Sequence, residues 1–179
     1  MTVLAQAIGF FAMASNIISY QFKKPKSIML FQLVGSALFA VNLIMLNATT
    51  GAILNIIGIF RALIYMNQDK IKLDKRLMLL VFTLVYLASY VCTFLVFNKA
   101  PSVQNLLVEI LPLIGMSAIT IGFSANNAKV IRFLGFINSP CWLTYNIIYF
   151  SLGGILCEIF GLISIISACI RHDTKHIKE

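Results

Sequence analysis

Long apolar runs, separated by short polar breaks, extend along the whole chain. A helix that spans a lipid bilayer needs about 20 mostly apolar residues. Seven runs approach this length, over residues 3–20, 27–46, 50–67, 77–97, 105–123, 129–150 and 153–171. The breaks contain Lys, Asn, Asp, Pro and Gly, which favour turns, and no segment is left over for a soluble domain. The pattern predicts an all-α membrane protein with seven transmembrane helices.

Composition supports this class. The chain has 179 residues, of which 60% are hydrophobic and 11% charged, and its mean hydropathy is +0.92. A soluble domain has about a quarter of its residues charged. The net charge of +8 therefore bears on membrane topology and lipid contact before it bears on nucleic acid. No basic patch is interleaved with aromatic residues, so we expect the lipid bilayer and no nucleic acid as partner.

The basic residues predict the orientation of the chain. If the N-terminus lies outside, the inner loops and tail hold 13 of the 14 Lys and Arg residues, and the outer side holds only Lys99. Cytoplasmic loops carry an excess of Lys and Arg, so the N-terminus is predicted outside and the C-terminus in the cytoplasm. Arg61 and Arg132 fall at inner helix ends, where snorkelling to the headgroups accounts for them. The first run lacks a positive flank and a cleavage site, so we expect a retained helix and not a signal peptide.

The first three predicted helices share features with the last three. "IGFFAMASNIISYQ", from Ile8, aligns with "IGMSAITIGFSANN", from Ile114, and Lys26 then aligns with Lys129. Three further positions of the first copy, Gly51, Ile56 and Gly58, align with Gly154, Ile159 and Gly161. The run at 77–97 has no counterpart, and one extra crossing lets the second triplet enter the membrane in the same direction as the first. The sequence predicts a 3+1+3 arrangement of parallel triple-helix-bundle repeats.

Several motifs carry a resemblance to known families. The segment 8–65, with "IGFFA", "YQFKKPKS" and "LNIIG", resembles a triple-helix unit of the SWEET/SemiSWEET (PQ-loop, MtN3-like) superfamily, and "CWLTYN" matches the Trp-x-x-Tyr pattern in the second copy. Through "VEILPLIG" and "CWLTYN…GGILCE", nearly the whole chain is similar to the YgjV-type bacterial inner-membrane proteins. The resemblance implies a SWEET-like fold in the bacterial inner membrane, and substrate contacts at the third-helix position held by Asn55 and Glu158.

The predicted divisions of the chain follow from the repeat. A first triple-helix bundle covers residues 1–68, a cytoplasmic loop and linker helix cover 69–100, a second bundle covers 101–171, and a cytoplasmic tail covers 172–179.

Glu158 is the strongest candidate for a functional residue. It is the repeat mate of Asn55, and both lie roughly 8 Å along the axis from the outer ends of their helices. A charge near the bilayer centre costs about 2.5–3.5 kcal/mol on insertion scales, so such residues face protein or water and mark pathways. The alternative is a structural hydrogen bond between helices. No cation is expected at the depth of Glu158, so its neutral form is expected in the empty, closed protein.

A set of residues is predicted to line one cavity with Glu158. Phe39 and its mate Trp142 would form apolar lids, and the groups one turn further along would donate and accept hydrogen bonds. The predicted substrate-binding residues are Asn55, Glu158, Phe39, Trp142, Asn42, Tyr145 and Asn146. Glu109, near the outer end of its helix, is a second candidate for a proton or cation site, or else an interfacial residue.

Other chemistry is not indicated. No catalytic triad, HExxH motif or phosphate-binding loop is present, so we expect no enzyme activity, no cofactor and no metal. His172 and His176 share one face of the tail, but a metal site needs more ligands. The four cysteines have no CxxC spacing and suit a buried hydrophobic role. The glycines of the repeat are expected to let helices approach closely.

The resulting hypothesis is a membrane facilitator or secondary transporter of a small polar solute. The solute would bind between the two bundles, and rocking of one bundle against the other would expose it to alternate sides. The alternative is a non-transporting receptor or scaffold that binds partners through "NQDKIKLDKR" and the tail. The hypothesis covers proton-coupled and passive transport, and a monomer as well as a homodimer.

Overall fold

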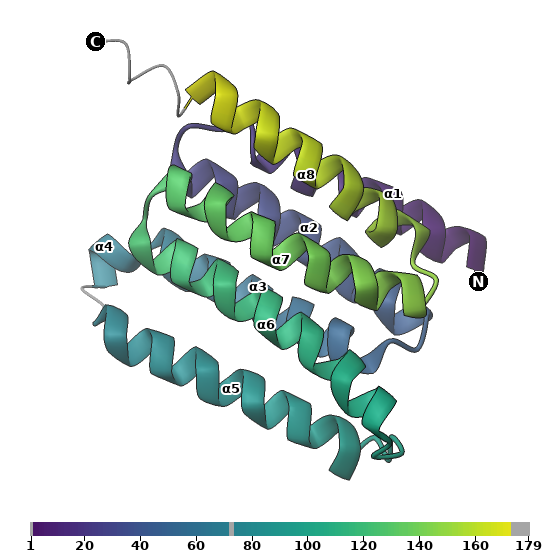
Figure 1. Ribbon diagram of the computed structural model, residues 1–179. Helices are drawn as coiled ribbons and strands as arrows, with labels where there is room; N and C mark the ends of the chain where they lie inside the picture. Colours follow the sequence, from purple (N-terminus) through teal and green to yellow (C-terminus); the bar gives the residue numbers. More distant parts are fainter. Residues whose placement is uncertain (1, 72–73, 173–179) are drawn as a thin grey trace.

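The computed structural model describes residues 2–71 and 74–172 as helices joined by short turns, with no strand among them (Figure 1). Seven helices are long, and each lies within a few residues of a predicted span. A short helix, which the sequence did not predict, precedes the fourth long helix. The helices are α1 (Thr2–Ser19), α2 (Pro25–Met45), α3 (Thr49–Met66), α4 (Gln68–Ile71), α5 (Lys75–Leu95), α6 (Val103–Ala125), α7 (Ala128–Ile148) and α8 (Leu152–His172).

Local chemistry explains where the helices begin. Pro25 is the first residue of α2, a position where its missing N–H costs nothing. Asp74 accepts a hydrogen bond from the backbone N–H of Arg76 at 2.8 Å, and Asn127 accepts one from Lys129 at 2.8 Å. These side chains satisfy N–H groups that the first helical turn leaves without a partner. The breaks read from the sequence therefore coincide with caps.

Six of the long helices form a closed ring. Each helix contacts the next in the order α1, α2, α3, α6, α7, α8, and α8 contacts α1 to close the ring. Helices α2 and α7 also approach each other across the ring. Successive long helices run in opposite directions, so the N-terminal end of α1 and the C-terminal end of α8 lie at opposite ends of the bundle (Figure 1). This ring creates the interior in which the candidate site lies.

Helix α5 lies outside the ring, against α6 and α3. Its buried residues are Phe82, Tyr86, Ser89 and Thr93, whose spacing of three and four places them on one helical face. The Phe82 ring stacks on Tyr65 of α3, with 5.8 Å between the ring centroids. Helix α5 therefore packs on the outside of the ring through a single face.

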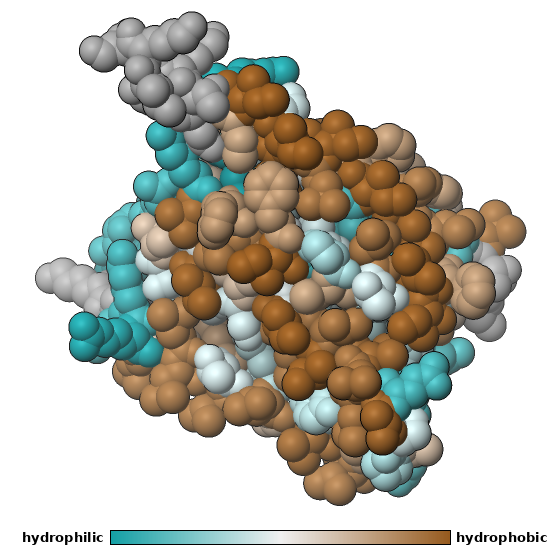
Figure 2. All heavy atoms as spheres, viewed as in Figure 1, coloured by the Kyte–Doolittle hydropathy of each residue, from teal (hydrophilic) through white to brown (hydrophobic). Residues whose placement is uncertain are grey.

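The outer faces of the helices are apolar. Figure 2 shows hydrophobic side chains covering most of the visible face, with hydrophilic ones gathered at the two ends of the helices. Among the described residues, five helices are long and apolar enough to cross a membrane, namely α2, α3, α5, α6 and α8, and α1 is a shorter apolar helix. Helix α7 does not meet the same criteria. Its second half contains the polar residues Asn138, Ser139 and Asn146. Ser139 and Asn146 are buried inside the bundle.

Candidate functional site

A cavity of about 60 Å³ lies inside the ring of helices. It is lined by side chains of α1, α2, α3, α6, α7 and α8, together with Tyr20 of the turn after α1. Five side-chain amides contribute to the lining: Asn16, Gln32, Asn55, Asn138 and Asn146. A concentration of amides in the centre of an apolar bundle needs an explanation beyond packing, because each amide must find hydrogen-bond partners there.

The cavity also contains two charged side chains of opposite sign, Arg61 and Glu158. They lie on α3 and α8, which do not neighbour each other in the ring. Between the described residues, no ion pair joins them. Arg61 lines the same cavity as Glu158, so its positive charge must enter any account of the charge on Glu158.

Arg61 is held inside the bundle and does not snorkel, since its exposed fraction is only 3%. Its Nη1 donates to the Met116 carbonyl at 3.1 Å and to the Thr120 hydroxyl at 3.3 Å. The guanidinium carbon lies 4.9 Å from the centroid of the Phe123 ring, a cation–π geometry. Helices α3 and α6 pack together. The Arg61 side chain therefore extends from α3 into the bundle, where its partners lie on α6.

Glu158 lies in the second turn of α8, is partly exposed and lines the cavity. Ser139 of α7 is close to its carboxylate. Asn55 of α3, its predicted repeat mate, lines the same cavity and donates a hydrogen bond to the Gly51 carbonyl of its own helix at 2.9 Å. The structure therefore brings these two residues together as expected.

Two apolar side chains close the cavity among the polar groups. Phe39 of α2 and Trp142 of α7 both line it and are nearly buried. The Trp142 ring packs against Gly115, where an added Cβ would lie 3.0 Å from the indole Cδ1. Gly161 of α8 also lines the cavity, and an added Cβ there would meet no atom within 4 Å. The expectation that Gly161 permits close helix packing is wrong, since it faces open space.

Several polar atoms around the cavity have no protein partner. Among the described side chains, the buried Oδ1 atoms of Asn16 and Asn146 and the Nε of Arg61 make no hydrogen bond. Such orphaned groups are rare in native interiors and indicate bound water, an ion or a ligand. A cavity of about 60 Å³ has room for a few water molecules, so a larger solute requires the helices to move.

Asn42 and Tyr145 do not line this cavity. The Asn42 amide donates to the Ala5 carbonyl at 2.8 Å and accepts from the Ser151 hydroxyl at 2.9 Å. The Tyr145 hydroxyl accepts a hydrogen bond from the Gly51 N–H at 2.9 Å. Both residues are fully buried and use their polar atoms to join helices. The structure therefore does not bring them to the central cavity, because helix packing directs these side chains towards neighbouring backbones.

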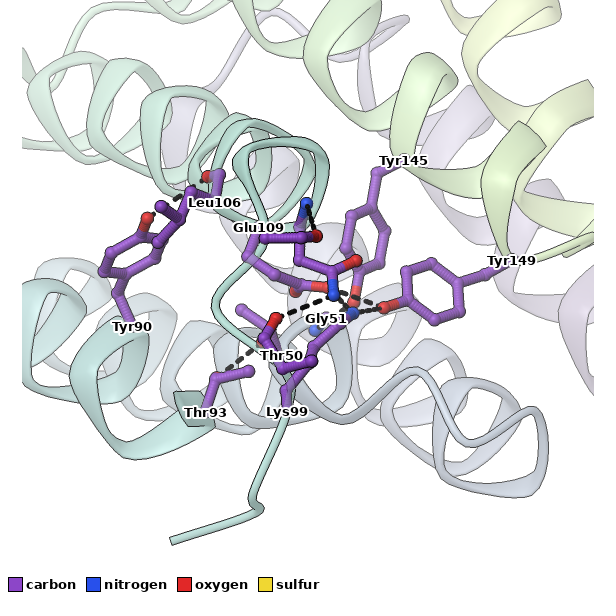
Figure 3. A network of polar contacts seen from close by, with 12 residues as sticks. Thr50, Gly51, Tyr90, Thr93, Lys99, Leu106, Glu109, Tyr145 and Tyr149 are labelled. Carbon is purple, nitrogen blue, oxygen red and sulfur yellow. Dashed lines mark hydrogen bonds and ion pairs between the residues drawn. The ribbon is translucent and has the colours of Figure 1, made fainter. Parts of the chain in front are cut away.

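Glu109 belongs to a separate cluster with Lys99 and Tyr149 (Figure 3). Its carboxylate is fully buried and forms an ion pair with Lys99 of the α5–α6 loop. The Tyr149 hydroxyl donates to the same oxygen at 2.5 Å, and Lys99 also donates to Tyr149. The cluster borders a pocket of about 270 Å³ with Thr50 and Thr93. Glu109 is therefore neither an exposed interfacial residue nor part of the central cavity.

The charge on Lys99 depends on this cluster. Burial alone would lower the pKa of the Lys99 ammonium, but the hydrogen bonds from it to Glu109 and Tyr149 and the negative charge of Glu109 outweigh burial. The pKa of Lys99 is consequently raised above its usual value. The ion pair joins the loop to α6 and is stable at neutral pH.

Arg132 also departs from the snorkelling expectation. Its exposed fraction is 2%, and its Nη1 donates to the Phe22 carbonyl at 3.2 Å.

Within residues 2–71 and 74–172, no group of three or more His, Cys, Asp or Glu side chains is arranged to hold a metal ion. His176 lies outside the described residues. The four cysteines carry free thiols, and Cys157 lines the central cavity.

Sequence reasoning missed six polar residues of the cavity: Asn16, Tyr20, Gln32, Ser36, Arg61 and Asn138. Arg61 had a signal, because "LNIIGIFRALIYM" places it about one and a half turns before the helix ends, and intramembrane charges usually face protein or water. The amides gave no comparable signal, since the sequence alone does not tell which face of an apolar helix points inward.

A family model described as a bacterial inner membrane protein, Imp-YgjV, matches residues 3–176. Neither the curated proteins nor the solved structures gave a match.

Proposed function

The chain belongs to this family of bacterial inner membrane proteins, and from that premise we propose that it is a facilitator or secondary transporter of a small polar solute. The observation that carries the proposal is the polar cavity within the helix ring. Keeping Arg61, Glu158 and five amides inside an apolar bundle costs free energy that a purely structural core would avoid. The orphaned atoms of Asn16, Asn146 and Arg61 supply donors and acceptors for a solute.

The arrangement of the ring supports two moving halves. Each contact within α1, α2 and α3 has a counterpart within α6, α7 and α8: α1–α2 corresponds to α6–α7, and α2–α3 to α7–α8. The two contacts between the triplets, α1–α8 and α3–α6, correspond to each other in the same way. A two-fold axis along the membrane normal would give this exchange, as in transporters built from parallel repeats. Three pairs at the same repeat spacing line the cavity: Phe39 with Trp142, Leu43 with Asn146, and Asn55 with Glu158.

The size of the cavity assigns a conformation to the structure. Ligand pockets usually measure about 300–1,000 Å³, whereas this one measures about 60 Å³. We propose that the structure represents a closed state, and that separation of the two triplets at the α1–α8 or the α3–α6 contact opens it to one side or the other. With basic residues on the cytoplasmic side, the N-terminus lies outside in this proposal.

The native Cys157 allows a direct test, since it lines the cavity and its exposed fraction is 3%. Cys92, Cys141 and Cys169 are replaced by Ser, and sealed vesicles of both orientations are treated with a small charged methanethiosulfonate that does not cross bilayers. Alternating access predicts labelling of Cys157 from both sides. Labelling from neither side or from one side only would favour a receptor or scaffold and would remove the proposal.

Saturable uptake supplies the second criterion. Polar solutes that slow the labelling of Cys157 are then tested as radiolabelled substrates in vesicles containing the protein. A carrier shows saturable uptake of at least one of them, and a receptor protects Cys157 without any uptake.

A further inference from the structure

The guanidinium of Arg61 has an unused edge. All its hydrogen bonds come from Nη1, which donates to groups of Met116, Thr120 and Tyr86 on α6 and α5. Within the described part of the chain, Nε has no hydrogen-bond partner although it is buried. The N–H groups of Nε and Nη2 are parallel, and together they match the two oxygens of a carboxylate. Arg61 therefore keeps a carboxylate-binding edge free.

No protein carboxylate pairs with this edge. The ion pairs between described residues join Lys26 to Asp69 and Lys99 to Glu109. Arg61 is 3% exposed, and a buried charge without an opposite charge is costly. An anion that enters the cavity would supply the missing negative charge.

The other charges of the cavity limit this anion to one negative charge. Among the described residues that line the cavity, Arg61 is the only Lys or Arg, and Glu158 is the only Asp or Glu. A second negative charge on the solute would have no cation and would be repelled by an ionised Glu158. Phosphate groups carry close to two charges at neutral pH. A carboxylate carries one and has the flat shape that the guanidinium edge matches.

The remaining orphaned atoms require hydrogen-bond donors. They are the Oδ1 atoms of Asn16 on α1 and Asn146 on α7, which have no partner among the described residues. Both amides line the cavity. A carboxylate only accepts hydrogen bonds, so it serves Arg61 but not these two oxygens. A solute that also carries a hydroxyl or amino group would serve all three, and it would connect the two triplets.

We infer that the solute is a small monocarboxylate with a hydroxyl or amino group. Its carboxylate binds the free edge of Arg61, and its hydroxyl or amino group donates to Asn16 or Asn146. This inference rests on the proposed function, but binding can be measured without any transport. Since the cavity measures about 60 Å³, the smallest members of the class are the appropriate probes.

The test compares acids with their amides, which have nearly the same shape without the charge. The full-length protein, purified in a neutral detergent, is titrated with sodium glycolate, glycolamide, sodium acetate, acetamide and sodium chloride. Thermal unfolding and the fluorescence of Trp142, the only Trp and a lining residue, report binding. We expect each amide to bind about tenfold or more weakly than its acid, because it loses hydrogen bonds between charged groups. Equal responses to acid and amide, a response to chloride as large as that to glycolate, or no response to either acid would overturn the inference.

The second half of the inference concerns the hydrogen-bond donor. Glycolate and glycine carry a hydroxyl and an amino group, which acetate lacks, so we expect both to bind more tightly than acetate. Acetate binding as tightly as both would overturn the assignment of the donor to Asn16 and Asn146.

A charge-preserving variant locates the carboxylate. Arg61→Lys keeps the positive charge and removes the planar pair of donors, so the ratio of glycolate to glycolamide affinity should fall about tenfold. The control, Arg76→Lys, makes the same change at an exposed position of α5 outside the cavity and should keep the wild-type ratio. An unchanged ratio in Arg61→Lys would overturn the assignment to Arg61. The acid and amide comparison in the wild type decides the inference even if Arg61→Lys does not fold.

Uptake separates this inference from the proposed function. Vesicles containing the protein are supplied with radiolabelled glycolate or glycine. Selective binding of these probes without uptake would contradict transport and leave the carboxylate site in place. Saturable uptake of an uncharged solute, with no binding of glycolate or glycine, would overturn the carboxylate site and leave transport in place.

Discussion

At the residue scale, the central cavity depends on two opposite charges that do not neutralise each other directly. Arg61 is anchored by α6, through the Met116 carbonyl, the Thr120 hydroxyl and the Phe123 ring. A guanidinium suits this position because its several donors have fixed directions and its flat face packs on an aromatic ring. Glu158 lies across the cavity on α8. A solute or water between them meets a donor on one side and a carboxyl on the other.

The single tryptophan makes Glu158 observable. Trp142 is the only Trp of the chain and lines the cavity with Glu158, so its fluorescence responds to a change of charge there. We expect Trp142 emission to titrate with pH in the wild type and this titration to disappear in Glu158→Gln, which mimics the neutral acid. The control is Glu109→Gln, outside the cavity, which should keep the titration. Persistence of the titration in Glu158→Gln would show that Glu158 keeps one charge state throughout.

Lys99 and Glu109 form an ion pair, and we expect the loss of Lys99 alone to cost more stability than the loss of both charges. Removing Lys99 as Lys99→Met leaves the fully buried Glu109 without its cation, and breaking a buried pair in this way costs about 3 kcal/mol or more. The double variant Lys99→Met with Glu109→Gln removes the buried charge as well. We therefore expect the double variant to regain much of the stability lost in Lys99→Met, measured by denaturant unfolding in detergent. Additive losses would mean that the pair contributes nothing as a pair.

The same pair predicts an alkaline limit of stability. The pKa of Lys99 is raised in the folded protein, where the effects of Glu109 and Tyr149 outweigh burial. For a group with a raised folded pKa, the added stability is fully present below the unfolded pKa, about 10.4 for lysine, and is lost as pH rises through the folded pKa. The difference in Tm between wild type and Lys99→Met should stay constant up to about pH 10 and shrink above it. A difference that is unchanged at pH 11.5 would contradict this assignment.

At the element scale, the glycines of α8 have different environments although the sequence makes them look alike. An added Cβ at Gly153 would lie 2.3 Å from the Gly9 carbonyl carbon, so α1 and α8 touch backbone to backbone. At Gly161 an added Cβ meets nothing within 4 Å, because that position faces the cavity. One glycine allows a close helix contact, and the other leaves space.

This contrast gives a matched pair of variants. Gly161→Ala should raise stability by up to about 1 kcal/mol, since alanine favours the helix over glycine and no clash follows. Gly153→Ala should lower it by more than that amount, because α1 must move away from α8. Thermal unfolding of both variants checks the order. Destabilisation by Gly161→Ala would show that the cavity is closed around this position.

A larger side chain at Gly161 tests the cavity itself. Gly161→Leu should keep the fold, fill space next to Cys157 and slow labelling of Cys157 in both vesicle orientations at least tenfold. The corresponding control, Gly161→Ala, occupies little volume and should label almost as fast as the wild type. Unchanged labelling in Gly161→Leu would place the access route away from this face of α8.

At the scale of the whole molecule, the bundle consists of a ring of six helices with α5 outside it. Its polar and charged residues form three groups along the bundle axis. The basic turns between α1 and α2 and between α6 and α7 lie at one end, the polar cavity lies in the interior, and the cluster of Lys99, Glu109 and Tyr149 lies at the other end. The ion pair of that cluster connects the α5–α6 loop to α6, next to the contact between α3 and α6. We propose that it is broken or rearranged when that side of the bundle opens.

Topology is the prediction that applies to the molecule as a whole. The described ends of the chain lie at opposite ends of the bundle (Figure 1), and the basic turns share one end with the C-terminal end of α8. We expect a C-terminal green fluorescent protein fusion to fluoresce and a C-terminal alkaline phosphatase fusion to be inactive, as a cytoplasmic C-terminus requires. The reverse result would invert the orientation and place the basic turns outside.

The sequence by itself determined the helical elements and the distribution of charge between their ends. Apolar runs of membrane length and the breaks between them are local properties, so the predicted spans agree with the long helices to within a few residues. Asn55, Glu158, Phe39, Trp142 and Asn146 could also be predicted to lie near one another, because the repeat spacing relates positions on different helices. The short α4 was missed, since four residues are too few to show a period.

Only the tertiary structure decided which side chains face the interior and what they meet there. An apolar helix in a membrane is hydrophobic on every face, so its rotation about its own axis is set by packing against neighbours and not by its pattern. That rotation directs Arg61 into the cavity with Glu158, turns Asn42 and Tyr145 to backbone partners, and leaves Gly161 facing open space. Hydrogen-bond partners and voids belong to pairs of helices, and a single helix sequence does not contain them.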